Sequence, residues 1–130
     1  MINYIRELVR GYQPISTKLI NINYLPLDGY SIAPTGQIDI TRYLSGCKKS
    51  VTFSFELSDK LSQIVAEQKA QSEFFTDFET WLTNVELPYW DDKHVPISIT
   101  VTRTGASTGE DGRGHIRYSC EFIFNFREVK

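Results

Sequence analysis

The sequence predicts an α+β domain, with a mixed or antiparallel sheet that has one face open to water and helices packed on its other face. Several segments place apolar residues at every second position, as strands with one buried face do. Two other segments, at the N-terminus and in the middle of the chain, place them at helical spacing. A length of 130 residues fits one domain, residues 1–130, with a single hydrophobic core.

Two helices are predicted. The first runs from Ile2 to Tyr12, where apolar residues recur at helical spacing before Gly11 ends the pattern. The second begins after Asp59, a suitable N-cap, and carries a strongly apolar face in its C-terminal half. A nearly all-polar stretch from Ala66 to Glu73 interrupts the apolar pattern, so we expect a kink or break near Gln71-Ser72.

The first strands are predicted as a β-hairpin. Lys18–Tyr24 alternates apolar and polar residues, and Asp28-Gly29 is a pair typical of a tight turn. Tyr30–Ile32 continues the alternation as a short second strand that stops at Pro34. A separate alternation follows at residues 38–40.

Three later segments have the clearest strand pattern, at residues 51–57, 97–102 and 116–126. Their apolar positions and those of the central helix are expected to face one another across the core, because each set lies on one side of its element. The predicted core residues are Phe53, Phe55, Phe78, Trp81, Leu82, Phe122 and Phe124.

Signals for catalysis or metal binding are weak. His94 lies in an expected irregular connection, Val85–Pro96, beside Asp91 and Asp92, and two adjacent carboxylates with one histidine are a poor metal signal without further ligands. We therefore interpret this segment as a solvated loop. His115, at the start of the last strand, has no motif partner. Since the sequence also lacks a nucleophile motif, we expect no enzyme activity, no cofactor and no bound metal.

Composition limits the expected partners and location. Fourteen Lys and Arg residues against sixteen Asp and Glu give a net charge of −2, which offers no general attraction to DNA or anionic lipid. No apolar run approaches the length of a membrane span and the N-terminus lacks a signal-peptide pattern, so we expect a cytoplasmic protein without membrane contact. Cys47 and Cys120 lack ligand spacing and are expected to be a free thiol near a turn and a buried apolar residue.

A glycine-rich segment, Gly105–Gly114, separates the last two predicted strands. Phosphate-binding loops are also glycine-rich, but they lead from a strand into a helix, whereas this segment joins two strands and contains Glu110 and Asp111. A hairpin loop of this length is typical of a contact site or a disordered segment. We predict that it is mobile in the isolated subunit and orders at an assembly contact, with the candidate residues Gly105, Gly109, Glu110, Asp111, Gly112, Arg113 and Gly114.

The order of segments resembles the minor capsid and tail-completion proteins of long-tailed bacteriophages. The resemblance covers the chain from about Asn21 to its end and depends on structural residues, with no catalytic signature among them. The matching segments are YLPLDGYSI at 24–32, ITRYLSGCKK at 40–49 leading into VTFSF at 51–55, EFFTDFETWL at 73–82, LP at 87–88, PISITVT at 96–102 and IRYSCEF at 116–122. The glycine content of Gly105–Gly114 departs from what the family leads us to expect.

The resemblance implies a tail terminator, which is a homo-oligomer forming a six-fold ring of α+β subunits. Such a ring caps the tail-tube protein and joins it to the head-connector protein, and DNA passes through its lumen without sequence-specific binding. The implied location is the head–tail junction of the virion, after assembly in the host cytoplasm. Two other virion roles fit the same resemblance, a different head–tail connector component or a tail-tube subunit. A small cytoplasmic enzyme or an immunity-type protein is a distant alternative that no motif supports.

Overall fold

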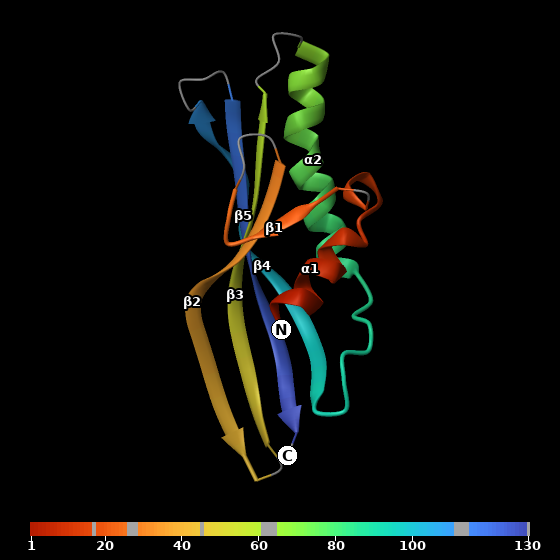
Figure 1. Cartoon of the computed structure of the whole chain (residues 1–130), viewed down its shortest axis with the longest axis vertical. Helices are drawn as coiled ribbons and strands as arrows, with labels where there is room; N and C mark the ends of the chain where they lie inside the picture. Colours follow the sequence, from red (N-terminus) through yellow and green to blue (C-terminus); the bar gives the residue numbers. More distant parts are fainter. Residues whose placement is uncertain (17, 26–28, 45, 61–64, 111–114, 130) are drawn as a thin grey trace.

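Five strands form one mixed sheet, and two helices lie on one side of it (Figure 1). The computed structural model describes residues 1–16, 18–25, 29–44, 46–60, 65–110 and 115–129. The elements in chain order are α1 (Ile2–Arg10), the 3-10 turn η1 (Gln13–Ile15), β1 (Ile20–Ile22), β2 (Gly29–Tyr43), β3 (Gly46–Lys60), α2 (Val65–Asn84), β4 (His94–Glu110) and β5 (His115–Val129). The predicted α+β class is therefore confirmed.

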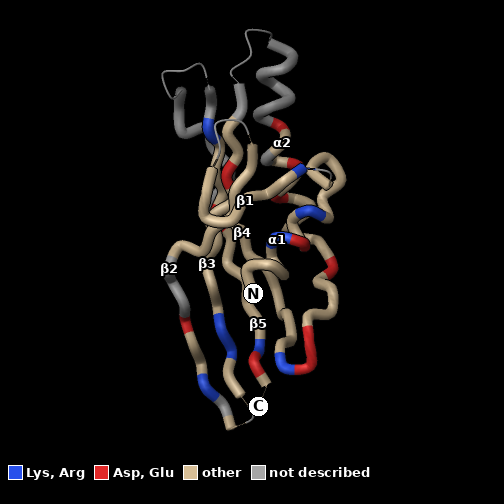
Figure 2. The backbone as a smooth tube through the Cα atoms, in the orientation of Figure 1, with Lys and Arg blue, Asp and Glu red and all other residues tan. Residues whose placement is uncertain are grey.

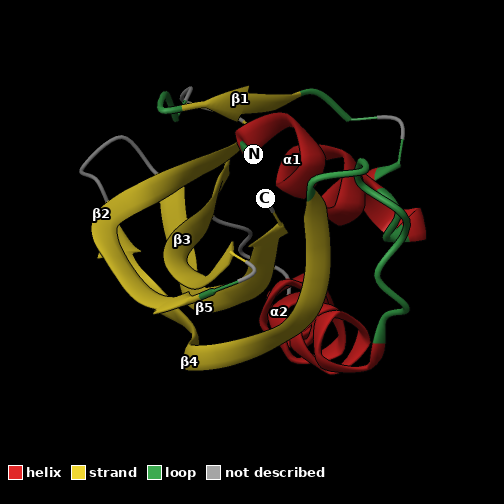
Figure 3. Ribbon diagram, turned by 90° about the horizontal axis from the view of Figure 1, so that it is seen from below, coloured by secondary structure: helices red, strands yellow, loops and turns green. Residues whose placement is uncertain are grey.

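The strand order is β1-β2-β3-β5-β4. Strand β1 pairs with β2 in parallel, and every other neighbouring pair is antiparallel. Seen from below, β2, β3, β5 and β4 follow a strong curve (Figure 3). Strands β3 and β5 form the longest continuous pairing in the sheet. It runs from the pair Gly46 and Val129 to the pair Lys60 and His115 without a register shift. The two strands form the middle of the sheet, with β2 and β4 on either side.

The predicted hairpin at the start of the sheet is wrong, because β1 and β2 run parallel. Ile20 pairs with Tyr30, and Ile22 with Ile32. Parallel neighbours normally need a long crossover, but β1 has only three residues and spans about 10 Å, so a short connection returns the chain to its start. Asn23 begins this return with φ 58, in the left-handed region where Asn is tolerated, and its N–H donates to Ile32 O at 3.1 Å.

Strand β2 is one long strand rather than the two short segments that the sequence predicts. Its register shifts between Pro34 and Ile38, which accommodates the proline without ending the strand. Proline is tolerated here because β1 pairs only with residues 30–32, so β2 at Pro34 is an edge strand that needs no donor on its outer side.

Helix α2 is continuous from Val65 to Asn84, so the predicted break near Gln71-Ser72 is wrong. The polar stretch consists largely of good helix formers such as Ala, Glu, Gln and Lys, whose backbone preference sustains the helix without an apolar pattern. Asp59 does not cap this helix. It belongs to β3, where pairing with Ile116 on β5 extends the strand to Lys60.

The predicted loop Gly105–Gly114 is wrong in extent. Gly105, Gly109 and Glu110 belong to β4, and β5 resumes at His115. The register of β4 against β5 shifts between Val101 and Arg103, between Arg103 and Ala106, and between Ser107 and Glu110. Glycine is well suited to such bulges because it has no side chain to accommodate, so the strand continues through the glycine-rich segment. Residues 111–114 lie outside the described part of the chain.

The core lies between the sheet and the two helices. Six of the seven predicted core residues are buried: Phe53, Phe55, Phe78, Leu82, Phe122 and Phe124. Phe53 stacks on Phe122 across β3 and β5 with 5.7 Å between ring centroids, and Phe55 lies 4.8 Å from Phe78 of α2. Helix α1 adds the buried Ile5, Leu8 and Val9, as its predicted apolar face requires.

Trp81 is the exception, since it is only half-buried. The centroid of the Trp81 ring lies 5.3 Å from that of the Tyr12 ring. Trp81 also packs against the backbone at Gly11, just after α1, so closely that a side-chain Cβ at this position would lie 3.6 Å from the Trp81 ring. Trp81 therefore closes the outer margin of the core between the two helices instead of its centre.

The opposite face of the sheet carries polar side chains, as predicted. Arg117 forms an ion pair with Glu56 at 2.8 Å across β5 and β3. Ser50 donates to Asn125, which in turn donates to Ser98, so a polar row crosses three strands. These groups stay half-exposed and satisfy one another, which leaves the face in contact with water.

Replacing Phe55 or Phe122 with alanine should lower the free energy of unfolding by about 3–5 kcal/mol, because each removes a wholly buried ring from the middle of the core. Urea unfolding followed by circular dichroism measures this change. Leu19→Ala is the control, since Leu19 is 68% exposed and its loss should cost less than about 0.5 kcal/mol. Equal midpoints for the parent, F55A and F122A would show that the core has been placed on the wrong face.

Candidate assembly surfaces

The histidine at the start of β4 is held by its own loop. The Asp91 carboxylate accepts hydrogen bonds from the backbone N–H of Lys93 at 2.9 Å and of His94 at 2.7 Å, and it also contacts His94 Nδ1 at 2.7 Å. The His94 ring stacks on Trp90 with 4.2 Å between centroids. Partial burial alone would raise the pKa of Asp91, but its hydrogen bonds with His94 and Lys93 outweigh this and hold the pKa below its usual value. These contacts fix a turn.

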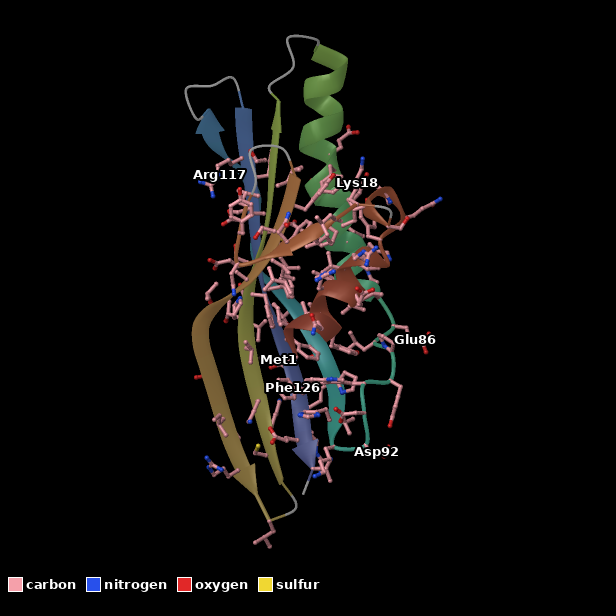
Figure 4. All side chains as sticks on the ribbon, viewed as in Figure 1. Met1, Lys18, Glu86, Asp92, Arg117 and Phe126 are labelled. Carbon is pink, nitrogen blue, oxygen red and sulfur yellow. The ribbon has the colours of Figure 1, made fainter. Side chains whose placement is uncertain are left out.

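Asp92 does not join Asp91 and His94 in a ligand set, because its carboxylate accepts a hydrogen bond from the Tyr89 hydroxyl at 2.5 Å. Within the described ranges, no group of three or more His, Cys, Asp or Glu side chains is arranged to hold a metal ion. Figure 4 shows Asp92 at the lower end of the molecule, at the turn before β4. The three residues therefore shape the connection between α2 and β4.

The two cysteines lie too far apart to react with each other. Cys120 is buried, and burial together with the charges of Glu79 and Glu121 raises the pKa of its thiol to about 12, so it stays protonated near neutral pH. Cys120 is paired in the sheet with Phe55 of β3. Because Phe55 lies eight residues after Cys47 on the same strand, the two cysteines are about 26 Å apart along the strands. Both thiols are free, as predicted.

The connection from Val85 to Lys93 is tied to both ends of the fold. The Tyr4 hydroxyl of α1 donates to Pro88 O at 2.7 Å, and the Tyr4 ring stacks on Trp90 at 5.0 Å. Near the C-terminus, the N–H of Val129 donates to Lys93 O at 2.7 Å. The start of β4 is therefore a fixed surface, because its flanking connection is anchored to α1 and β5.

Lys49 and Glu128 form an ion pair at 2.5 Å across β3 and β5, close to the start of β4. The hydrogen bond from Lys49, and its charge, hold the pKa of Glu128 below its usual value. This pair stabilises the lower end of the sheet.

The two sides of the sheet end in strands with an open edge. Strand β1 covers only residues 30–32 of β2, so in the described part of the chain no strand pairs with the outer side of β2 from residue 34 onward. Strand β4 forms the opposite edge, where an isolated antiparallel bridge joins its first residue, His94, to Asp91 of the preceding connection. An open edge carries unpaired backbone donors and acceptors and is a template for pairing with another chain. We call residues 34–43 the β2 edge and residues 94–99 the β4 edge.

Both edges expose large apolar side chains. On the β2 edge Ile40 is 46% exposed, and on the β4 edge Val95 is 47% and Ile97 is 43% exposed. Beside the β4 edge lies a groove of about 260 Å³ between the end of α2, the following connection and β4. Its lining residues are Leu82, Thr83, Val85, Leu87, Pro96, Ile97, Ser98 and Ile99.

Charges of both signs lie near each edge, Asp39 and Arg42 on the β2 edge, and Asp91, Asp92 and Lys93 in the turn before the β4 edge. Figure 2 shows basic residues along the lower parts of β2 and β3 and acidic residues at the turn before β4. Arg42 is exposed on the β2 edge, whereas Asp91 and Asp92 precede the β4 edge. The exposed apolar side chains of the two edges and the satisfied carboxylates suit contact with a protein surface better than binding of a small polar ligand.

A second hollow lies on the polar face of the sheet, where Tyr24 and Leu25 adjoin Ser54, Glu56 and Arg117. Its charged groups already pair with each other, as the Arg117–Glu56 ion pair shows. Nothing in it resembles a nucleophile with its base.

The contact residues predicted from the sequence are divided by the structure. Gly105, Gly109 and Glu110 lie in the upper part of β4, while Asp111, Gly112, Arg113 and Gly114 fall outside the described residues. Exposed strand edges that a ring neighbour could cover are expected for such a sheet, but none of the contact residues predicted from the sequence lies on the β2 edge or the β4 edge. A partial signal was available in Pro34, because proline inside a strand pattern indicates an edge strand.

The remaining observations concern the chain as a whole. None of the helices in the described residues is both long and apolar enough to span a membrane. The sequence matches no protein-family model and no curated protein. The fold does match a chain in the structure of the virion of a native gene transfer agent particle, with a TM-score of 0.59 over 95% of this chain and 91% of that chain. The two sequences are 14% identical, so the likeness is one of fold alone.

Proposed function

We propose that this chain is a structural protein of a bacteriophage virion or a phage-like particle, without an enzymatic role. The observation that carries the proposal is the match of nearly the whole fold to a chain from the virion of a gene transfer agent particle. The order of sequence segments supports the same class independently of the fold. The described residues contain no metal-binding cluster, and Asp91, Asp92 and His94 make structural contacts.

Within that class, the role we propose is that of tail terminator. In this role the chain forms a homo-oligomeric ring of six subunits that caps the tail-tube protein and joins it to the head-connector protein. Two open edges on opposite sides of one sheet support ring formation, because a head-to-tail contact between different surfaces closes into a ring when the rotation allows. The net charge of −2 suits a lumen through which DNA passes without being held.

The purified full chain should assemble into closed six-subunit rings that do not stack. Native mass spectrometry gives the number of subunits, and negative-stain electron microscopy shows whether a lumen is present. Rings that stack without limit would instead support the second candidate, a tail-tube subunit. A concentration of about 0.1 mM exceeds the dissociation constants of ordinary weak complexes. A chain that stays monomeric at this concentration would contradict the ring.

The segment that follows β4 in the sequence is a further proposed contact, through Glu110, Asp111 and Arg113. Since β4 reaches Glu110 and β5 begins at His115, replacing residues 111–114 with Asn-Gly leaves the described strands intact. The variant should keep the urea midpoint of the parent but complete fewer tails, because the charged segment is missing from the contact. Electron microscopy of particles assembled with the variant counts finished tails. Tail completion at the parental level would show that the segment is not a contact.

A further inference from the structure

We propose that copies of this chain join through their sheet edges, with the β2 edge of one copy pairing antiparallel to the β4 edge of the next. The sheet then continues from subunit to subunit. This inference rests on the proposed ring and specifies the surfaces that build it. Its partner is a second copy of the same chain, and four features of the two edges support that choice.

Strand direction is the first feature. From β2 through β3 and β5 to β4, each strand is antiparallel to its neighbour, so β2 and β4 run in opposite directions. Figure 1 shows β2 ending at the bottom of the molecule and β4 beginning there. A second copy placed beside the first, without being turned end over end, therefore presents its β2 antiparallel to β4. Antiparallel pairing between the copies repeats the pattern within each copy.

The second feature is which residues of the two edges lie at the same height along the strands. Strand pairing places Arg42 in one row with His94, through Cys47 and Glu128. Two rows further inward, Ile40 lies level with Pro96, through Lys49 and Phe126. Copies that meet at the same height along the strands therefore bring Ile40 toward Pro96 and Arg42 toward the turn before His94.

Apolar complementarity is the third feature. Ile40 is 46% exposed on the β2 edge although it lies on the sheet face that carries the core. At the same level on the opposite edge, Pro96 and Ile97 line the groove beside the β4 edge, together with Leu87. Most of the residues that line the groove are apolar, although the surface they expose in it is largely polar, and its volume has room for an aliphatic side chain. Strand pairing at this level removes both the exposed isoleucine and the groove from water.

Charge complementarity is the fourth feature. Arg42 is exposed at the level of His94, where the Asp91 and Asp92 carboxylates form the turn that precedes the β4 edge. The hydrogen bonds that Asp91 accepts keep it ionised at neutral pH, which favours a cation beside it. A neighbouring Arg42 supplies that charge. The two edges thus match in direction and level, and at this level they bring Ile40 toward Pro96 and Arg42 toward Asp91 and Asp92.

Chemical cross-linking tests this contact directly. In a Cys47→Ser background, Ile40→Cys and Ile97→Cys are introduced into the same full-length chain, which is then treated with a short bis-maleimide. The buried Cys120 remains unreactive in the folded protein. The two introduced positions lie on opposite edges of the sheet, three strand spacings or about 14 Å apart, so a short linker joins them only between copies. The expected product is a ladder of covalent oligomers on a denaturing gel.

The matched controls are the two single-cysteine variants, I40C and I97C, which cannot form a ladder because each subunit carries only one exposed introduced thiol. Ile40→Lys tests the contact without a cross-link, and Leu19→Lys is its control, since Leu19 is more exposed and lies away from both edges. The I40K assembly should dissociate into monomers at a protein concentration at least tenfold higher than the parent assembly does. L19K should dissociate at the same concentration as the parent. Equal urea midpoints for the two variants establish that both fold.

The outcomes separate this inference from the proposed function. A ladder that ends at six subunits, together with loss of assembly in I40K, supports both. A ladder that grows without limit supports edge pairing and contradicts the terminator. Closed rings that survive I40K and give no ladder overturn edge pairing while leaving the terminator standing. A parent chain that never assembles contradicts both.

Discussion

The pairing of β3 with β5 is the interaction on which the rest of the structure depends. Fifteen residues of each strand match without a register shift, from Gly46 with Val129 to Lys60 with His115. This continuous ladder aligns Phe53 with Phe122 on the core face and sends the intervening polar residues to the opposite face. The strand that closes each side, β2 or β4, tolerates bulges because the centre fixes the direction and level of the sheet.

The same central pair accounts for the surfaces that are left open. With β3 and β5 in the middle, β2 and β4 are forced to the two sides, and the three-residue β1 covers only a small part of β2. Both helices pack on one face, so they leave the β2 edge without a cover. Neighbouring strands normally hide such backbone groups, and an assembling subunit can leave them for its neighbour to pair. At the start of β4, Asp91 and His94 hold the turn that precedes the β4 edge.

Local patterns predicted the elements better than their connections. Alternation along Phe53–Leu57 and the helical spacing in α1 report directly which face is buried, so the core positions followed from them. The Asp28-Gly29 pair suggested a hairpin, but strand direction depends on partners far away in sequence, and β1 runs parallel to β2. The Gly105–Glu110 stretch suggested a loop, yet β5 offered it a partner and bulges absorbed the glycines. Apart from the partial signal of Pro34, the identity of the open edges could not be predicted, because it depends on strand order, which local residue patterns do not encode.

Hydrogen–deuterium exchange on assembled and dissociated protein tests the central claim, that this chain builds its particle through the edges of its sheet. Amide groups of β3 and β5 are hydrogen-bonded within one subunit and should exchange slowly in both states. In the β2 edge, residues 34–43, and the β4 edge, residues 94–99, the amides that do not bond to β3 or β5 should exchange quickly in the free subunit and become protected on assembly. Assembly that protects other segments and leaves both edges exchanging as fast as in the free subunit would contradict the account.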